Sequence, residues 1–503
     1  MTTHDIRIAG ERPPAVPSWK PLVAVLAAIM VVAVAFTDVV PLLEVTFLVV
    51  AGLALAFAHR VLLSWPVLLS GIALVIMFIP IRRYTIPVEL PFELEPYRIL
   101  VAFIVIGWGA CLLADPRVTL RRSGFEAPIA VIVVGVVGSV LSNPGRVAEL
   151  STDVVKDLTF LASFLLLFYL IVSVVRTRRA IDILLGTLVL SGAVVGLFAL
   201  IESRTRWNVF NQLGGVVPFL DNAALPDEET RGGRLRVFGS AQHPIALGAA
   251  LVVLLPFAVY LARRSARRIW WVPAAMLTLG AFSTVSRTSI VMLGVAAITF
   301  FILRPKEVRK FAIPALVLLP VLVHLALPGT LGSLKKSFFP EGGLIADQER
   351  AAGQRGAGRV ADLGPAFDEL AKSPAFGQGY GTRITDADRA NAQILDNQWL
   401  KTLLETGVIG ALGWFWLIVA IVRRLGRAAK EDPSPDGWLP TACAASIAAF
   451  AVGMFTYDAF SFIQVTLLLF IALAVGACTL RLGEHEARAP ATAPGSAAGP
   501  ARA

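Results

Sequence analysis

Long apolar segments recur along almost the whole chain, and they constrain its fold more than any other feature. A helix needs roughly 20 mostly apolar residues to cross the hydrocarbon core of a bilayer. About fourteen segments of the 503-residue chain approach this length and apolarity. The sequence therefore predicts an all-α polytopic membrane protein with about 14 (12–14) transmembrane helices. The segments cover approximately 21–37, 39–58, 62–81, 98–114, 126–142, 157–175, 181–201, 243–262, 269–284, 286–303, 311–327, 403–424, 438–457 and 460–480.

The composition agrees with this fold class and argues against others. Hydrophobic residues make up 56% of the chain and charged residues only 16%, whereas a soluble domain carries about 25% charged residues. Cys111, Cys443 and Cys478 lie in apolar runs without metal-ligand spacing, so neither a disulfide scaffold nor a metal site is expected. The net charge of +10 comes from short basic clusters between apolar segments. This pattern is typical of a membrane protein and not of a nucleic-acid-binding one.

The basic clusters also predict an orientation, because cytoplasmic loops carry an excess of Lys and Arg. If every predicted span crosses, these clusters fall on one side and both termini are cytoplasmic. The longest polar segments then face the extracytoplasmic side, together with 82–97 and 143–156. The clusters are Arg117/Arg121/Arg122, Arg176/Arg178/Arg179, Arg263/Arg264/Arg267/Arg268, Arg304/Lys306/Arg309/Lys310 and Arg423/Arg424/Arg427/Lys430.

This topology predicts an organisation into seven parts, two of which are long extracytoplasmic loops. The second loop contains apolar residues at helical spacing, Val360, Leu363, Phe367 and Leu370, which predict a short amphipathic helix on the outer surface. The glycines of the stretch 377–381 predict a tight turn after it. The parts are a cytoplasmic tail 1–20, a helical bundle 21–201, a loop 202–242, helices 243–327, a loop 328–402, helices 403–480 and a disordered cytoplasmic tail 481–503.

Several basic residues lie on the predicted outer side, where three helices begin. Arg234 and Arg236 precede the span 243–262, Arg287 begins the span 286–303, and Lys401 precedes the span 403–424. Helix N-termini present unpaired N–H groups and the positive end of the helix dipole, so they bind phosphate well. If the three starts converge, Arg236 and Arg287 form a permanently charged clamp for a diphosphate. The alternative is that each arginine extends to the lipid headgroups.

Three further residues are candidates for proton transfer. His243 precedes Pro244 and is either a helix start signal or a catalytic group. Asp396 and Asn397 precede an apolar run, as helix caps do. The alternative is that Asp396 or Glu405, close to lipid, acts as a general base towards a hydroxyl. The residues alone leave the choice between these two carboxylates open.

In this order, the motifs resemble the O-antigen ligase and polymerase superfamily of bacterial membrane glycosyltransferases. The resemblance runs from about Arg234 to Gly413. In the ligases a histidine usually precedes the asparagine of the last motif, and here Asp396 takes that position, which favours a polymerase or another exopolysaccharide transferase. The motifs are Arg236-Val237-Phe238-Gly239, Gln242-His243-Pro244, Leu247-Gly248, Ser286-Arg287, Ser373 to Gly381, Asp396-Asn397-Gln398-Trp399-Leu400 and Glu405-Thr406-Gly407-Val408-Ile409-Gly410.

The resemblance implies a function at the extracytoplasmic face of the bacterial plasma membrane. The protein would move a glycan from an undecaprenyl-diphosphate carrier to an acceptor hydroxyl of a glycan or glycolipid, without metal, nucleotide sugar or other cofactor, and without nucleic acid as a partner. Asp396, Glu405 or His243 would be catalytic, and Arg236, Arg287 and Arg234 would bind the diphosphate. Further substrate contacts are expected from Arg82, Arg83, Arg98, Asn397 and Trp399.

The main alternative is a flippase or transporter of lipid-linked glycans. Alternating access would place ionisable residues near the membrane midplane in both halves of the chain. The predicted topology instead gathers them at the outer rim of the C-terminal half, which favours the transferase.

Overall fold

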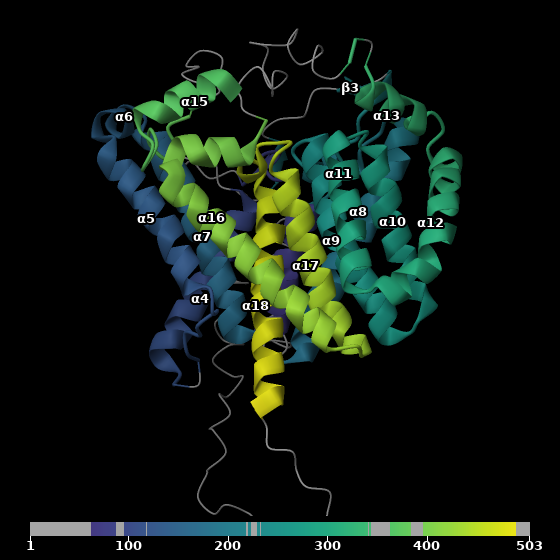
Figure 1. Cartoon of the computed structure of the whole chain (residues 1–503), viewed down its shortest axis with the longest axis horizontal. Helices are drawn as coiled ribbons and strands as arrows, with labels where there is room; N and C mark the ends of the chain where they lie inside the picture. The colour runs from purple at the N-terminus through teal and green to yellow at the C-terminus, as the bar shows by residue number, and fades with distance from the viewer. Residues whose placement is uncertain are drawn as a thin grey trace, which may run out of the picture.

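The structure, a computed structural model, is a bundle of long helices that run between two ends, named upper and lower after their places in Figure 1. It describes residues 62–86, 95–116, 118–217, 220–222, 229–231, 233–340, 342–343, 363–383 and 396–488. The long helices are α3 (Trp65–Phe78), α4 (Pro96–Ala114), α5 (Glu126–Ser142), α7 (Ser151–Val174), α8 (Arg178–Thr205), α9 (Pro244–Ser265), α10 (Trp271–Ser283), α11 (Arg287–Leu303), α12 (Pro305–Ala326), α16 (Gln398–Glu431), α17 (Trp438–Gly453) and α18 (Ile463–Arg488).

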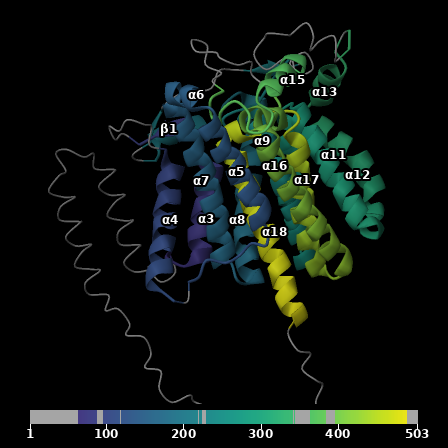
Figure 2. The same cartoon turned by 60° about the vertical axis from the view of Figure 1, so that its left-hand side comes forward.

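Short elements gather at the upper end in both views (Figures 1 and 2). They are helices α6 (Pro144–Glu149), α13 (Thr330–Phe338) and α15 (Leu363–Lys372), and two antiparallel ladders that pair β1 (Tyr84–Thr85) with β2 (Asp221–Asn222) and β3 (Thr230–Arg231) with β4 (Arg234–Leu235). Single-turn 3-10 helices are η1 (Val209–Asn211), η2 (Leu213–Gly215), η3 (Arg268–Trp270), η4 (Pro435–Gly437) and η5 (Ala459–Ser461). The predicted all-α class therefore holds in the described ranges apart from these two-residue strands.

The predicted spans correspond well to the observed helices. Every predicted span from 62–81 onwards contains a helix, whereas 21–37 and 39–58 lie outside the described residues. Among the described residues, six helices are long and apolar enough to cross a membrane, namely α4, α7, α8, α9, α16 and α18. The end of α12 and α13 form a further pair bent by 111°. The structure thus agrees with a helical membrane protein, while the total of about 14 crossings and the seven-part organisation stay predictions.

Some boundaries differ from the prediction. The segment 143–156, expected as a polar loop, is helical, because Pro144 begins α6 and α7 starts at Ser151. Helix α18 continues to Arg488, into the tail that was expected to be disordered from 481. Helix α15 confirms the predicted amphipathic helix over 363–372, although Phe367 of the expected apolar face is 55% exposed. Val360 and Asp362 lie outside the described residues.

The burial pattern is that of a bundle embedded in lipid. The apolar window of α18 is wholly buried, and α9 is nearly so, which places these two helices at the centre. On outer helices large apolar side chains are exposed, such as Ile106 (71%), Leu113 (92%) and Leu316 (76%). Exposed apolar surface of this extent is unfavourable in water and expected in contact with lipid tails. Close approach of helices relies on small residues, as where Gly135 of α5 meets Gly410 of α16.

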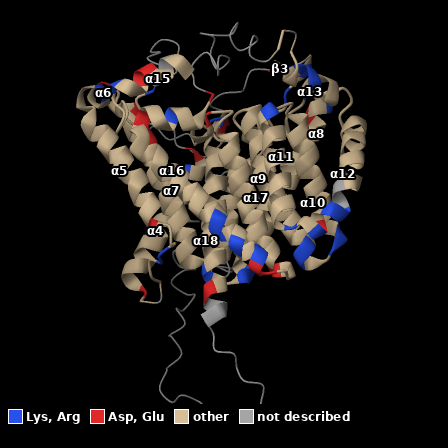
Figure 3. Cartoon of the chain, viewed as in Figure 1, with Lys and Arg blue, Asp and Glu red and all other residues tan. Residues whose placement is uncertain are grey.

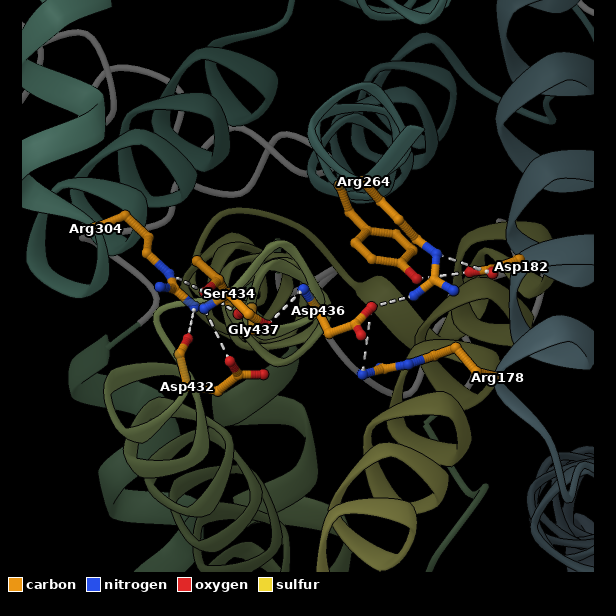
Figure 4. Close-up of polar contacts among 10 residues, drawn as sticks. Arg178, Asp182, Arg264, Arg304, Asp432, Ser434, Asp436 and Gly437 are labelled. Carbon is orange, nitrogen blue, oxygen red and sulfur yellow. Dashed lines mark hydrogen bonds and ion pairs between the residues drawn. The ribbon is translucent and has the colours of Figure 1, made fainter. Parts of the chain in front are cut away.

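Lys and Arg residues concentrate at the lower end of the bundle (Figure 3). Several clusters predicted to share one side meet there at the turn between α16 and α17 (Figure 4). Arg264 pairs with Asp182 (Nε to Oδ2, 3.2 Å) and with Asp436. Arg304 donates to the carbonyl of Asp432 (2.7 Å) and to the hydroxyl of Thr441 (3.2 Å). The polar contacts of the lower end therefore join α8, α9, α12 and the α16–α17 turn. They agree with the prediction that these basic clusters lie on the same side of the membrane.

Candidate active site

The β3–β4 ladder brings a glutamate against the first predicted diphosphate-binding arginine. Thr230 pairs with Leu235, so Glu229 lies opposite Arg236. The backbone N–H of Arg236 donates to the Glu229 carbonyl (2.8 Å), and Nη1 of Arg236 lies 2.6 Å from Glu229 Oε2. Nε of Arg236 reaches the carbonyl of Thr284 (3.4 Å), whereas its Nη2 is buried without a hydrogen-bond partner. The guanidinium is thus held in place while one donor group stays available.

Arg236 lies in a strongly charged surrounding. Its residue is 4% exposed, and this burial lowers the pKa of the guanidinium. The carboxylate of Glu229 and, more weakly, that of Asp396 raise the pKa, whereas the charge of Arg287 lowers it. The charges that act on Arg236 thus come from three other parts of the chain, at Glu229, Arg287 and Asp396.

His243 is connected to the same glutamate. Its Nδ1 accepts the backbone N–H of Ile245 (3.1 Å) as the N-cap of α9, and its Nε2 lies 3.1 Å from Glu229 Oε1. Because Nδ1 is an acceptor, the neutral ring carries its proton on Nε2 and donates it to Glu229. Burial favours a raised pKa for Glu229, but the hydrogen bond from His243 and the charge of Arg236 lower it below the usual value. The structure thus gives His243 the role of a helix start and a support for Glu229.

Arg287 begins α11 directly after a sharp turn. Val285 has a positive φ of 49°, and this turn redirects the chain from α10 into α11. Nη1 of Arg287 donates to the carbonyl of Ser337 at the end of α13 (3.1 Å). A Cβ on Gly248 in α9 would overlap the hydroxyl of Ser289 in α11, so the starts of the two helices are in direct contact. The convergence of helix starts expected from the sequence is therefore present for α9 and α11.

Helix α16 is interrupted beside this site. Gly407 has φ 66° and ψ −168°, which no helix contains, and a Cβ there would overlap the carbonyl of Ala375. The segment 374–378 takes up the backbone groups released by the interruption: the N–H of Val408 donates to Pro374 (2.9 Å), and the carbonyl of Leu404 accepts from Gln378 (2.9 Å). The glycines 377, 379 and 381 all have positive φ, which confirms the predicted tight turn. The first turns of α16 thus form a short arm that ends at Glu405 and Thr406.

A cavity of about 810 Å³ lies between this arm and helices α7 and α18. One part of its wall is apolar and includes Phe160, Phe164 and Phe470, and the other part carries charged side chains. In that part Nζ of Lys401 lies 3.1 Å from Asp458 Oδ2 and 3.3 Å from Ser461 Oγ. The charged residues of the wall are Arg82, Asp153, Lys156, Asp157, Arg383, Asp396, Lys401, Glu405 and Asp458.

The arginine cluster and the cavity adjoin each other. Asp396 lines the cavity, and its charge also acts on Arg236. Phe462 lines the cavity as well, and the centre of its ring lies 5.5 Å from that of His243. The two parts therefore form one continuous site at the upper end, with Asp396 at their border. In the part of the chain that the structure describes, no three His, Cys, Asp or Glu side chains form a group suited to a metal ion.

Not all predicted site residues come together here. Arg234 donates to the carbonyl of Pro328 at the α12–α13 turn, beside Arg204. Asn397 is the N-cap of α16, with Oδ1 accepting the N–H of Leu400 (3.1 Å), so the capping interpretation holds for it. Trp399 donates from Nε1 to the carbonyl of Ala451 (2.9 Å) and is not part of the cavity wall. These three contribute to the shape of the site through backbone contacts.

The arginines of the segment 82–98 have three different surroundings. Arg82 is exposed and lines the cavity. Arg83 is 3% exposed and donates to Asn211 Oδ1 and to the carbonyls of Gly239 and Ala241, while its substrate contact stays a prediction. Burial lowers the pKa of Arg83 to about 10. Arg98 pairs with Glu95 (2.9 Å) behind Phe160 of the cavity wall.

The sequence interpretation missed Glu229, Asp157 and Asp458 as members of the site. A signal for Glu229 exists, since Gly232 and Gly233 between Arg231 and Arg234 are a two-residue hairpin pattern that places Glu229 opposite Arg236. Asp458 lies between two apolar runs, where an ionisable residue is a functional candidate. For Asp157 the sequence offers no signal beyond its place near a helix start.

Fold and site together define a multi-pass helical membrane protein with a charged site at one end of its bundle. Residues 272–415 match the model of a family described as O-antigen ligase, and in this stretch the chain carries an O-antigen ligase-like domain. The stretch spans less than a third of the chain, from α10 into α16, and contains Arg287, Asp396 and Glu405. No curated protein matches the chain. The family confirms the resemblance seen in the sequence and indicates a membrane glycosyltransferase of the ligase or polymerase type, which acts on a lipid-linked glycan and an acceptor.

Proposed function

We propose that the protein transfers a glycan from undecaprenyl diphosphate to an acceptor hydroxyl at the extracytoplasmic face of the bacterial plasma membrane. The observation that carries this proposal is the contact between the starts of α9 and α11, where Nε of Arg236 reaches the carbonyl of Thr284 and Arg287 begins α11. The concentration of Lys and Arg at the lower end supports a cytoplasmic lower end and an extracytoplasmic site. The product would be a polymer or a ligated glycan, according to the acceptor that the cell presents.

In this reaction the arginines stabilise the leaving group. The acceptor oxygen forms a bond to the anomeric carbon of the donor, the bond from that carbon to the phosphate oxygen breaks, and undecaprenyl diphosphate leaves. Nη2 of Arg236, buried and without a partner, is a donor suited to a phosphate oxygen, and Arg287 adds a second permanent charge. Preorganised charges of this kind act without reorganisation cost in the transition state.

Asp396 is the group best placed to take the proton of the acceptor hydroxyl. It lies between the arginine cluster and the cavity, so a hydroxyl presented from the cavity meets both the base and the donor carbon there. Glu405, the alternative base, lies further along α16, at the end of its short arm. Because the arginines neutralise the diphosphate, the reaction requires neither a metal ion nor a nucleotide, and we expect chelators to leave transfer unchanged.

The test is transfer by the purified full chain in proteoliposomes that contain undecaprenyl-diphosphate-linked oligosaccharide and an acceptor extract of the cell envelope. We expect release of undecaprenyl diphosphate and glycosylated acceptor from the native chain, and loss of both with Arg287→Ala at unchanged folding. The matched control is Arg264→Ala at the lower end. Normal transfer by Arg287→Ala would contradict the proposal, and movement of the donor between leaflets without transfer would indicate a flippase.

A further inference from the structure

The charged part of the cavity is chemically different from the arginine cluster beside it. Five carboxylates and four basic groups line it, so its formal charge is slightly negative when all are ionised. Two of the basic groups are already paired, Arg383 with Glu369 and Lys401 with Asp458. Carboxylates match the basic groups of this part, so it offers a diphosphate little net attraction, and a hydrocarbon chain would remove water from charged groups without giving them hydrogen bonds. The chemistry of this part therefore fits neither the diphosphate nor the lipid tail of a donor.

Two carboxylate oxygens in this wall lack hydrogen-bond donors. Oε1 of Glu405 and Oδ1 of Asp458 are both buried without a partner. A buried carboxylate oxygen is stabilised by an O–H or N–H group, and leaving it without one is costly. Asp458 uses its other oxygen for Lys401 and Ser461, so its arrangement is fixed before any ligand binds. The two oxygens are therefore positioned to accept hydrogen bonds from hydroxyl groups.

Aromatic side chains complete the wall. Trp414 of α16 and Phe460 of η5 lie with ring centres 4.7 Å apart, and Phe462 lines the same cavity. Their faces provide rigid apolar surface next to the carboxylates. Hydroxyl acceptors beside aromatic faces suit a sugar ring, which has hydroxyl groups at its edge and C–H groups on its faces. The cavity volume of about 810 Å³ lies in the range usual for ligand pockets.

We propose that this cavity is the acceptor site and that it binds a neutral saccharide, with Glu405 and Asp458 accepting hydrogen bonds from its hydroxyls and Trp414 packing against a ring face. The proposal rests on the glycosyl transfer proposed above and adds the class of acceptor. It gives Glu405 a binding role and leaves Asp396, at the border of the cavity, to take the proton of the reacting hydroxyl. An acceptor with carboxylate groups is disfavoured by the acidic wall.

The test measures saccharide binding without any lipid-linked donor. The probes are the methyl glycosides of glucose, galactose and mannose and the corresponding methyl uronosides, observed by saturation-transfer difference NMR with the detergent-purified full chain. We expect at least one neutral glycoside to bind and its uronoside to bind at least about tenfold more weakly. Glu405→Gln removes one charged acceptor and raises Kd for the neutral glycoside about tenfold.

A second variant keeps the proposal testable if Glu405→Gln fails to fold. Lys401→Met/Asp458→Leu replaces both members of the ion pair by apolar side chains, so neither of the two is left as an unpaired buried charge, and we expect it to fold and to lose glycoside binding. Asp436→Asn at the lower end is the matched control and binds as the native chain does. Absence of binding for all neutral glycosides, equal binding of the uronosides, or native binding by both cavity variants would overturn the proposal.

The outcomes also separate this proposal from the proposed transfer. Glycoside binding that needs Glu405 in a protein without transfer activity would leave the saccharide site in place and remove the transferase function. If Glu405→Gln keeps transfer activity with an unchanged acceptor KM, the transferase function stands and the saccharide site in this cavity is wrong. Loss of glycoside binding in Arg236→Ala alone would place the sugar at the arginines and contradict the cavity as its site.

Discussion

Two buried or half-buried arginines at opposite ends of the bundle differ in how their donors are used. Arg264 at the lower end contacts two carboxylates, Asp182 and Asp436, and its side chain is 31% exposed. Arg236 at the upper end contacts one carboxylate, is 4% exposed, and keeps Nη2 without a partner. Burying an arginine that pairs with one carboxylate and leaves a donor group without a partner is the less stable arrangement. The upper arginine is therefore better explained by a ligand than by stability, and the lower one by the joining of helices.

Of the substitutions that test this comparison, Arg236→Ala should cause the largest fall in transfer rate. Removing one preorganised donor to a developing charge costs about 10²–10³ in rate, and we expect a fall in transfer near the upper limit, because the Arg236 charge is also lost. Initial rates of undecaprenyl diphosphate release measure it. Arg236→Lys keeps the charge but not the forked donor geometry, and it should recover only part of the rate.

The control for this comparison is Arg264→Ala. It should lower the melting temperature and retain transfer per folded molecule. Equal losses of transfer in Arg236→Ala and Arg264→Ala would show that the two ends do not differ in function.

Asp396→Asn is the next test and should lower kcat about a hundredfold, as loss of a general base does. Glu405→Gln should instead raise the acceptor KM and change kcat little. The measurement is the dependence of initial rate on acceptor concentration. A selective loss of kcat in Glu405→Gln, with Asp396→Asn near native, would reverse the two roles.

Glu229→Gln should have a smaller effect, about tenfold on transfer, because Glu229 positions Arg236 and His243. The folded-state pKa of Glu229 is lowered, so its contribution to stability is present above its unfolded pKa of about 4.3 and is lost as pH falls through the lower folded value. The difference in melting temperature between native and Glu229→Gln chains should therefore be constant near neutral pH and decrease under acidic conditions. A difference that grows on acidification would contradict the assigned contacts.

The smallest effect is expected from Asp436→Asn at the lower end. The Asp436 side chain is 53% exposed, and exposed ion pairs contribute about 0–1 kcal/mol. We expect a melting temperature lower by a few degrees at most, and unchanged transfer. Added salt should reduce this difference, since it screens exposed pairs.

The helices were predictable from the sequence because lipid imposes a simple pattern on it. Runs of about 20 apolar residues identified every described long helix, including α10 and α11 on either side of Arg287. The residues of the arginine cluster were also predictable, since charged groups at helix starts near lipid are rare. Both the apolar spans and the few charged residues at helix starts near lipid can therefore be recognised in the sequence.

The interruption of α16 and the wall of the cavity were not predictable in the same way. Gly407 lies in an apolar run where a glycine is tolerated in a straight helix, and only the approach of Ala375 requires its conformation. Asp157 and Asp458 are 301 residues apart in numbering and face the same cavity through the packing of α7 and α18. Long-range packing of this kind leaves no local pattern in the chain.

The interruption at Gly407 also determines how deep the site lies. Without it, the 34 residues of α16 would form a rod about 50 Å long, well beyond the hydrocarbon thickness of about 30 Å. Lys401 and Glu405 would then project into the aqueous phase, far above any lipid-borne substrate. With the interruption, about 24 residues cross and the first turns lie across the upper end of the bundle (Figure 1). A single glycine with positive φ thereby keeps Lys401 and Glu405 within the upper end of the bundle instead of beyond it.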